Sequence, residues 1–294
     1  MLVPAEPGRP MSSARRATAH DVPSIARPAM MPGTVSKGVR AFEAFGVRFA
    51  VSAPVDDETL VAHLPPTSRH VRRRSDDRLF AIVPASKARY DVFDGAARSG
   101  LGQRLPAALS TVAADLRRTL AERSPGLVFV HAGVVGWAGR AVVVPARSEA
   151  GKSSLVAGLV QAGAEYLSDE YAPLDADGVV HPYPQDIRLR VDGEEVAVAP
   201  RELGGSVANG PMPVGAIVVT SFHQPSTRWR PRQAEPAEGA IALLKHAVAA
   251  RSRPAEALAA VAAAARESTV LVGRRGDASD AAPAILRRLA AAWT

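Results

Sequence analysis

The stretch that decides the fold is Gly139-Arg140-Ala141-Val142-Val143-Val144-Pro145-Ala146-Arg147-Ser148-Glu149-Ala150-Gly151-Lys152-Ser153-Ser154-Leu155. It predicts a short apolar strand, a loop of eight residues that ends in Gly-Lys-Ser, and the first turn of an amphipathic helix. In that order, the strand carries the loop to the edge of a sheet, and the backbone N–H groups of the loop point at an anion. The helix adds the positive end of its dipole. The stretch therefore predicts a phosphate-binding loop.

Within this loop, two side chains have defined expected parts. Lys152 is expected to reach the β- and γ-phosphates of a nucleotide, and the Ser153 hydroxyl is expected to ligate Mg²⁺. Ala146 stands where the pattern normally has glycine, a tolerated variant because the position needs a small side chain. Glu149 is unusual, since its carboxylate must point away from the phosphates or weaken their binding. The candidate nucleotide-binding residues are Ala146, Arg147, Ser148, Glu149, Ala150, Gly151, Lys152, Ser153 and Ser154.

The use of lysine supports this interpretation. The chain has only four lysines, at positions 37, 87, 152 and 245, among 36 basic residues, so arginine carries nearly all the positive charge. Because lysine is rare in this chain, its presence at the one position that needs a compact ammonium group supports a functional role there. The alternative is a surface strand–helix turn with an incidental Gly-Lys-Ser.

Composition bounds the class of protein. The 294 residues are 47% hydrophobic and include no cysteine, which excludes disulfides, thiol catalysis and cysteine-ligated zinc. The chain has no run of about 18 uncharged apolar residues, so no transmembrane helix is expected. The first residues lack the basic and apolar segments of a signal peptide, so a cytoplasmic location is expected. No interaction with a membrane is expected.

The net charge of +7 raises the question of nucleic acid. The densest basic cluster, Arg69-His70-Val71-Arg72-Arg73-Arg74, lies beside Asp76 and Asp77 and has no aromatic or glycine residues between its charges. A solvated loop is the favoured interpretation, and nucleic acid is not expected as a partner.

The chain divides into three expected regions. Residues 1–38 are rich in Pro, Ala, Arg and Ser without periodicity, which predicts a disordered leader. Residues 39–104 predict a small α+β domain with strands near 47–51, 79–83 and 90–93 and a short helix near 56–64. Residues 105–294 predict the larger domain, of α/β class with a phosphate-loop nucleotide-binding core.

The elements expected in the larger domain follow from periodicity and from glycine and proline positions. Helices are expected at 105–120, 151–162, 237–248, 254–266 and 280–292. Strands are expected at 127–130, 141–144, 164–174, 179–184, 187–191, 214–220 and 269–272, with turns at 192–193 and 273–276.

Two adjacent carboxylates, Asp169 and Glu170, lie on the strand expected at 164–174. Strand ends on the phosphate-loop side of an open α/β sheet form the ligand crevice, so both are expected to face the γ-phosphate and its metal. The alternative is a charged strand end in solvent.

Three motifs in this order resemble one family. His131, then Ala146 to Ser153, then Ser168-Asp169-Glu170 resemble the catalytic half of HPr serine kinase/phosphorylase. The chain is still more similar to HPr-kinase-related proteins of actinobacterial biosynthetic clusters, which share the Tyr-Leu-Ser-Asp-Glu-Tyr stretch, His181-Pro182-Tyr183-Pro184 and the Arg-Arg-Gly of 274–276. The resemblance covers roughly residues 125–290.

The resemblance implies a kinase whose nucleotide-binding core is related to phosphoenolpyruvate carboxykinase, with ATP and Mg²⁺ as cofactors. The acceptor would be a serine-type hydroxyl of a protein, peptide or small molecule, and a homo-oligomer is left open. By the same resemblance, Asp169 is the catalytic base, Glu170 joins Ser153 at the metal, and His131 is the active-site histidine. Arg188, Arg190 and Arg251 are candidates for stabilising the charge of the transferring group, and Arg190 ranks first because it follows His181-Pro182-Tyr183-Pro184. The alternative is a catalytically degenerate nucleotide-binding protein that regulates or scaffolds a biosynthetic pathway.

Overall fold

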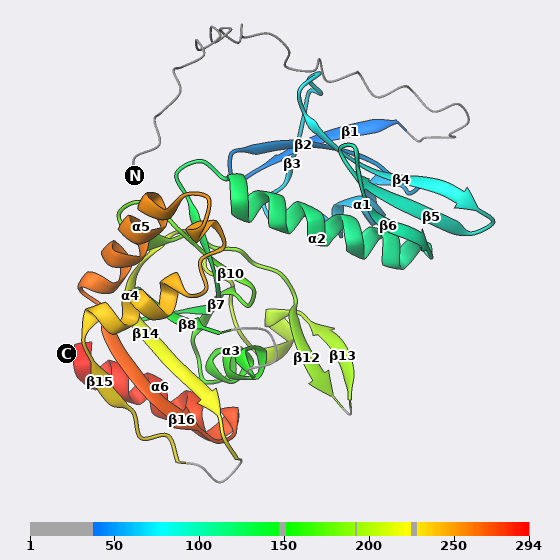
Figure 1. The fold of residues 1–294 in the computed structure, drawn as a ribbon. Coiled ribbons are helices and arrows are strands. Elements are labelled where there is room, and N and C mark those ends of the chain that lie inside the picture. The colour runs from blue at the N-terminus through cyan, green and yellow to red at the C-terminus, as the bar shows by residue number, and fades with distance from the viewer. Residues whose placement is uncertain (1–37, 147–150, 192, 225–227, 294) are drawn as a thin grey trace, which may run out of the picture. The chain divides into compact units, whose positions relative to one another are not determined.

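The computed structural model describes residues 38–146, 151–191, 193–224 and 228–293 (Figure 1). They belong to one compact unit, Thr34–Thr294, built of helices and two main sheets, which confirms the predicted α/β class. The leader expected at 1–38 lies, apart from Gly38, outside the described residues. No described helix has the length and apolar character needed to cross a membrane.

The first part of the described chain forms a six-stranded sheet with the order β3-β1-β2-β4-β5-β6. Strands β4 and β5 pair antiparallel, as the apolar runs at 79–83 and 90–93 predict. The carboxylate of Asp56 accepts a hydrogen bond from the Thr59 N–H at 2.8 Å and caps helix α1 (Asp57–Val61). The strands are β1 (Val39–Ala44), β2 (Val47–Ser52), β3 (Arg69–Val71), β4 (Arg78–Ser86), β5 (Arg89–Asp94) and β6 (Ala97–Gln103).

Helix α2 (Leu105–Arg123) covers this sheet. Its apolar stripe, with Leu109, Val112 and Leu116, is buried against strand residues such as Phe49 and Phe80. The stripe recurs every three to four residues, the spacing that places side chains on one helix face. The charged face of α2 is left for other contacts, one of which reaches the candidate site.

The second main sheet has eight strands in the described chain, in the order β11-β10-β7-β8-β14-β16-β15, with β9 also paired to β7. Strands β8, β14 and β16 run parallel, and β7 runs antiparallel to β8, β9 and β10. The strands are β7 (Val128–Trp137), β8 (Arg140–Pro145), β9 (Glu165–Ser168), β10 (Tyr171–Leu174), β11 (Val179–Val180), β14 (Met212–Phe222), β15 (Arg232–Ala234) and β16 (Thr269–Arg275).

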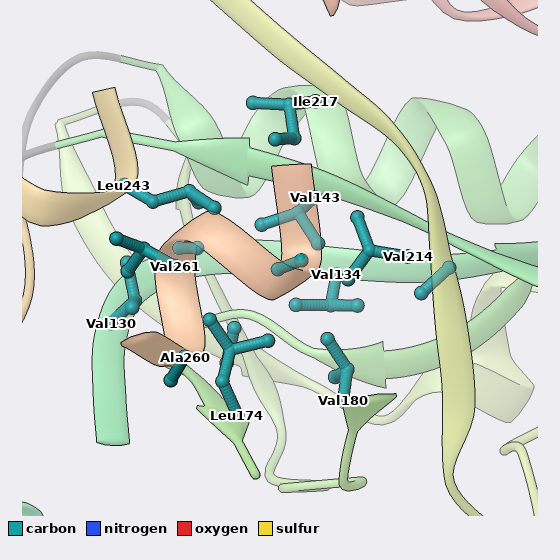
Figure 2. Close-up of a cluster of buried hydrophobic side chains, with 14 of the residues drawn as sticks. Val130, Val134, Val143, Leu174, Val180, Val214, Ile217, Leu243, Ala260 and Val261 are labelled. Carbon is teal, nitrogen blue, oxygen red and sulfur yellow. The ribbon is translucent and has the colours of Figure 1, made fainter. Parts of the chain in front are cut away.

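Alternation along the strands gives this sheet two apolar faces. Val134, Val143 and Ile217 face one core together with side chains of α4 and α5, and Figure 2 shows these residues gathered with Leu243 and Val261. The intervening positions on the strands face a second core with α3 and α6. The helices are α3 (Lys152–Gln161), α4 (Pro236–Leu244), α5 (Pro254–Arg266) and α6 (Ala278–Trp293), with 3-10 turns η1 (Pro200–Leu203) and η2 (Val248–Ala250).

A two-stranded hairpin, β12 (Ile187–Val191) and β13 (Glu194–Val198), stands apart from both main sheets. Its antiparallel pairing, Ile187 opposite Val198 and Val191 opposite Glu194, confirms the predicted reversal of the chain between the strands. The pairing places Arg190 opposite Glu195.

Four element predictions need correction. The strand expected at 164–174 is interrupted between β9 and β10, although both segments pair with β7. The helix expected at 237–248 ends at Leu244, because the chain turns away so that the His246 carbonyl accepts the His131 N–H at 2.9 Å. The turn expected at 273–276 is mostly strand, because Gly273 to Arg275 pair with β14. The strand expected at 179–184 is only Val179–Val180.

Candidate functional site

Three motifs that are separate in the sequence meet around strand β7. On one side of β7, Ala132 lies opposite Pro145, the last residue of β8 before the phosphate loop. On the other side, His131 lies opposite Tyr171, the residue after the acidic pair. Ala146, at the start of the loop, and the acidic pair are therefore both next to His131, because β8 and β10 pair with β7 on opposite sides.

The N-terminus of helix α3 forms one wall of the site. Gly151 is its N-cap with φ +71°, a left-handed conformation that glycine adopts without strain. The side chains of Lys152 and Val156 lie over Gly133 of β7: a Cβ at Gly133 would be 3.2 Å from Lys152 Cγ and 2.3 Å from Val156 Cγ2. The missing side chain at Gly133 is therefore what lets α3 approach the sheet at this point. No local feature of the sequence predicts this close approach at Gly133.

The acidic pair occupies the interruption between β9 and β10. The buried hydroxyl of Ser168 accepts hydrogen bonds from the backbone N–H groups of Glu170 at 3.2 Å and Tyr171 at 3.1 Å, which fixes the turn. The Asp169 carboxylate has a side-chain hydrogen bond with Ser153, and its Oδ1 is buried with no hydrogen-bond partner among the described residues. Asp169 thus lies next to the first turn of α3.

Glu170 is held by a residue from another part of the chain. Arg117 of α2 lies with its Nε 3.1 Å from Glu170 Oε1, and the two side chains are 20% and 35% exposed. Arg117 lies off the apolar stripe of its helix, and no local signal in the sequence distinguishes it from the other arginines.

Burial dominates the protonation of the central pair. It raises the pKa of the Asp169 carboxyl, although the Lys152 charge and the Ser153 hydrogen bond act in the opposite direction. It also lowers the pKa of Lys152, against the charges of Asp169 and Glu170. The pKa of His131 is lowered first by desolvation and then by Lys152, which favours the neutral imidazole at pH 7.

These residues line a pocket of about 590 Å³. Of the predicted site residues, it contains His131, Ala146, Gly151, Lys152, Ser153, Ser154, Asp169, Glu170 and Arg190. The predicted loop residues Arg147, Ser148, Glu149 and Ala150 lie outside the described residues. The pocket also contains Arg188, which was a lower-ranked candidate. The lining residues without a predicted role are Arg117, Tyr166, Gln185, Asp186 and Glu195.

Arg188 and Arg190 enter the pocket wall from strand β12. Arg188 forms an exposed ion pair with Glu195, Nη1 to Oε1 at 2.6 Å. Arg190 is exposed. The hairpin thus brings basic side chains to the pocket from residues distant in sequence from the loop.

The oxygen ligands in the pocket are few. The described residues contain no group of three or more His, Cys, Asp or Glu side chains that could hold a metal ion by themselves. Asp169, Glu170 and the Ser153 hydroxyl are hard oxygen donors, the kind that Mg²⁺ takes when phosphates and waters complete its shell. The unpartnered Asp169 Oδ1 is free to serve in that way.

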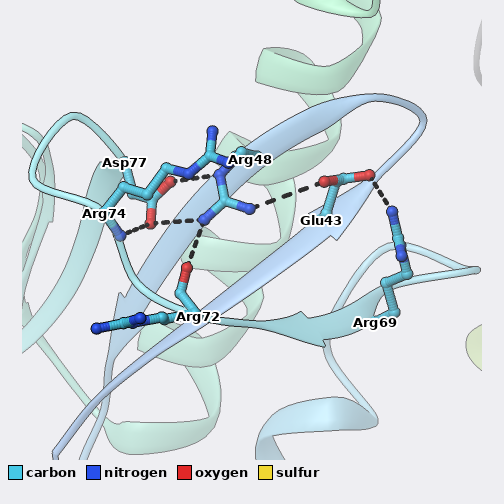
Figure 3. Close-up of polar contacts among 6 residues, drawn as sticks. All are labelled: Glu43, Arg48, Arg69, Arg72, Arg74 and Asp77. Atoms are coloured by element: carbon cyan, nitrogen blue, oxygen red, sulfur yellow. Dashed lines mark hydrogen bonds and ion pairs between the residues drawn. The ribbon is translucent and has the colours of Figure 1, made fainter.

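The basic cluster at 69–74 is partly neutralised within its own sheet, as Figure 3 shows. Arg69 pairs with Glu43 at 2.6 Å, and Arg48 pairs with the buried carboxylate of Asp77 at 3.0 Å. The carbonyl of Arg72 accepts a hydrogen bond from Arg48 at 2.6 Å. The cluster is therefore only partly the solvated loop that was expected, because Arg69–Val71 form strand β3, which pairs with β1.

Comparisons with known proteins give little beyond this geometry. No protein-family model matches the chain. No curated protein matches it either. Among solved structures, the chain is similar to an Hpr(Ser) kinase/phosphatase from Coxiella burnetii, with a TM-score of 0.32 and 12% identity over 56% of this chain and 95% of that one. Values this low do not establish a shared fold or family.

Proposed function

We propose that the protein is an ATP-dependent kinase that transfers the γ-phosphoryl group to a serine-type hydroxyl of a peptide, protein or small molecule. The observation that carries this proposal is the meeting of Lys152, Ser153 and Asp169 in one pocket at the N-terminus of α3. Phosphoryl transfer depends on positioning and on charge neutralisation far more than on covalent chemistry. A helix N-terminus, a lysine and a carboxylate beside the acceptor are the groups this reaction uses.

In this proposal Lys152 binds the β- and γ-phosphates, and Asp169 accepts the proton of the attacking hydroxyl. Burial lowers the pKa of Lys152, and a bound phosphate would offset that burial by its negative charge. Burial raises the pKa of Asp169, which brings the carboxylate closer to the range where a general base is effective.

Ser153 and Glu170 would hold Mg²⁺ together with the phosphates, which leaves Asp169 to act as the base. The bound cation would supply Lewis-acid stabilisation of the charge that develops on the transferring group. The Ser153 hydroxyl and the Glu170 carboxylate are hard oxygen donors of the kind that Mg²⁺ takes. Glu170 also forms an ion pair with Arg117, and this ion pair holds the Glu170 carboxylate at the pocket wall.

His131 and Arg190 have supporting parts in the proposal. A neutral His131, favoured by its lowered pKa, would donate or accept a hydrogen bond at the acceptor side of the pocket without adding charge. Exposed Arg190 would add positive charge near the transferring group.

The second candidate is a nucleotide-binding protein that regulates or scaffolds a pathway without turnover. It would use the same phosphate site, and it differs from the kinase only in the absence of transfer. The buried Ala146 at the first position of the loop is the feature in the described chain that departs from the usual phosphate-loop pattern.

The test compares wild-type protein with Lys152→Ala, Asp169→Asn and the control Asp186→Asn, which removes an exposed carboxylate from the same pocket wall. ATP binding is measured by calorimetry, and transfer is measured from γ-labelled ATP with Mg²⁺ to candidate peptides, proteins and small hydroxyl compounds. We expect Asp169→Asn to lower the transfer rate by about 10²- to 10⁴-fold, Lys152→Ala to abolish it, and Asp186→Asn to retain it.

Full activity in both Lys152→Ala and Asp169→Asn would reject the kinase assignment. ATP binding by the wild type with no labelled acceptor in any class would favour the regulatory alternative.

A further inference from the structure

Arg275 is a buried arginine beside the N-terminus of α3, and the proposed chemistry does not yet use it. It is the last residue of β16 and lies opposite Phe222, the last residue of β14. Because β8, β14 and β16 are parallel, their C-terminal ends meet at one edge of the sheet, the edge at which β8 leads into the phosphate loop. Figure 1 shows β14 and β16 side by side in this sheet.

The guanidinium of Arg275 binds the start of helix α3 directly. Its Nη2 donates to the carbonyl of Gly151 at 2.5 Å, and its Nη1 donates to the carbonyl of Gly276 at 2.9 Å. A Cβ on Gly151 would lie only 2.7 Å from Nη2, so the guanidinium occupies the space that the glycine leaves. The Phe222 ring covers the group, with its centroid 5.8 Å from the Arg275 Cζ.

Among the described residues, the positive charge of Arg275 has no carboxylate partner. The residue is only 2% exposed, its Nε has no hydrogen-bond acceptor, and no ion pair joins it to a carboxylate within the described part of the chain. Buried charges in proteins are ordinarily paired, because desolvation is costly. Here burial lowers the pKa of the guanidinium, and Asp277 offsets the effect only in part. An arginine stays protonated under these conditions, so this end of β16 holds a buried cation that no described carboxylate pairs with.

We infer that Arg275 is a positioning residue for polyphosphate, and the inference rests on the proposed use of a nucleotide at this loop. Its hydrogen bond fixes the Gly151 carbonyl, so that the N–H groups at the first turn of α3 point toward the phosphates. Its charge adds to the helix dipole and to Lys152 in attracting an anion with several negative charges. The consequence is discrimination by phosphate number: nucleoside di- and triphosphates gain more from Arg275 than a monophosphate does.

The test measures the dissociation constants of ATP, ADP and AMP, each with Mg²⁺, for the wild type and three variants. Arg275→Gln removes the charge, Arg275→Lys keeps the charge but loses the planar fork of donors, and Arg274→Gln removes the exposed neighbouring charge as the control. Thermal unfolding of each variant is recorded alongside.

We expect Arg275→Gln to weaken ATP and ADP by about 10- to 100-fold, the range for a lost hydrogen bond of a charged group. AMP should change by less than about threefold, Arg275→Lys should be intermediate for ATP, and Arg274→Gln should match the wild type. If Arg275→Gln does not fold, the same comparison between Arg275→Lys and the wild type decides the matter.

ATP affinity equal to the wild type in a folded Arg275→Gln protein would overturn the inference. So would an equal loss for ATP, ADP and AMP with a lower unfolding midpoint, because that pattern belongs to a purely structural residue. If the wild type binds none of the three nucleotides, both the inference and the proposed function fail. If it binds ATP with the expected dependence on Arg275 but transfers nothing, only the kinase assignment fails.

Discussion

Replacing Gly133 with alanine tests whether the contact between β7 and α3 sets the position of Lys152. The new Cβ would lie 2.3 Å from Val156 Cγ2, and Val156 is fully buried, so the side chain has no free space to enter. Reaching an ordinary contact requires a movement of about 1 Å, and overpacking of this kind typically costs about 1–3 kcal/mol. Lys152 Cγ, at 3.2 Å from the same Cβ, must move with the helix. A displacement of about 1 Å at a catalytic group can cost on the order of 10²-fold in rate.

The assay is chemical denaturation together with ATP binding, for Gly133→Ala, Val156→Ala and the double variant. Val156→Ala removes the colliding methyl group and costs about 2 kcal/mol by itself. In the double variant the alanine at 133 fills the space, so the two costs should fall short of additivity by about 1 kcal/mol or more. Gly210→Ala is the matched control, because a Cβ there meets nothing within 4 Å. Wild-type stability and wild-type ATP affinity in Gly133→Ala would refute the reasoning.

Three further predictions concern Asp169 and the residues around it. Asp169→Asn should raise the unfolding midpoint near pH 7 while removing phosphotransfer: burial raises the pKa of this carboxyl, so its contribution to stability is present below the unfolded pKa and is lost as pH rises through the folded pKa. Thermal unfolding against pH checks this, and a lower midpoint for Asp169→Asn at pH 7 would count against it. The pH profile of the transfer rate should be narrowed on both sides. The raised pKa of Asp169 moves the acid limb to higher pH, and the lowered pKa of Lys152 moves the alkaline limb to lower pH. An acid limb that is unchanged in Asp169→Asn must come from another group. Ser168→Ala leaves two backbone N–H groups without their acceptor, so it should cost about 1–3 kcal/mol in denaturant unfolding and lower the transfer rate; a neutral result would show that Ser168 does not fix the turn.

The elements of this fold were predictable wherever their signal is local. The apolar run before the loop, the stripe on α2 and the glycine at position 163 predict β8, α2 and the end of α3, and Gly163 has the expected positive φ of +101°. Such features depend on residues within a few positions of one another, and periodicity or glycine conformation reveals them directly.

Other features depend on contacts that the sequence does not display. Arg275 binds a carbonyl 124 positions away, and Arg117 reaches Glu170 from a helix whose apolar face belongs to another core. Arg117 has no local signal that separates it from the other arginines, and the Arg-Arg-Gly motif of 274–276 does not show which atoms Arg275 contacts. The early end of α4 has the same cause, since the His246 carbonyl leaves the helix to accept a hydrogen bond from His131 on β7.

The charges of the candidate site are arranged at the expense of the stability of the unliganded protein. Lys152 and Asp169 attract each other, yet burial still shifts the pKa of each toward its neutral form. Among the described residues, Arg275 is a buried cation without a carboxylate partner, and Asp169 Oδ1 is a buried acceptor without a donor. A chain selected only for stability would replace such groups with apolar ones or pair them within the fold. A ligand that carries several negative charges would offset the positive charges of Lys152 and Arg275, and the attacking hydroxyl of the acceptor would donate a hydrogen bond to Asp169. The unsatisfied groups therefore point to the same class of ligand that the loop pattern predicts, and they do so from contacts that the loop pattern does not contain.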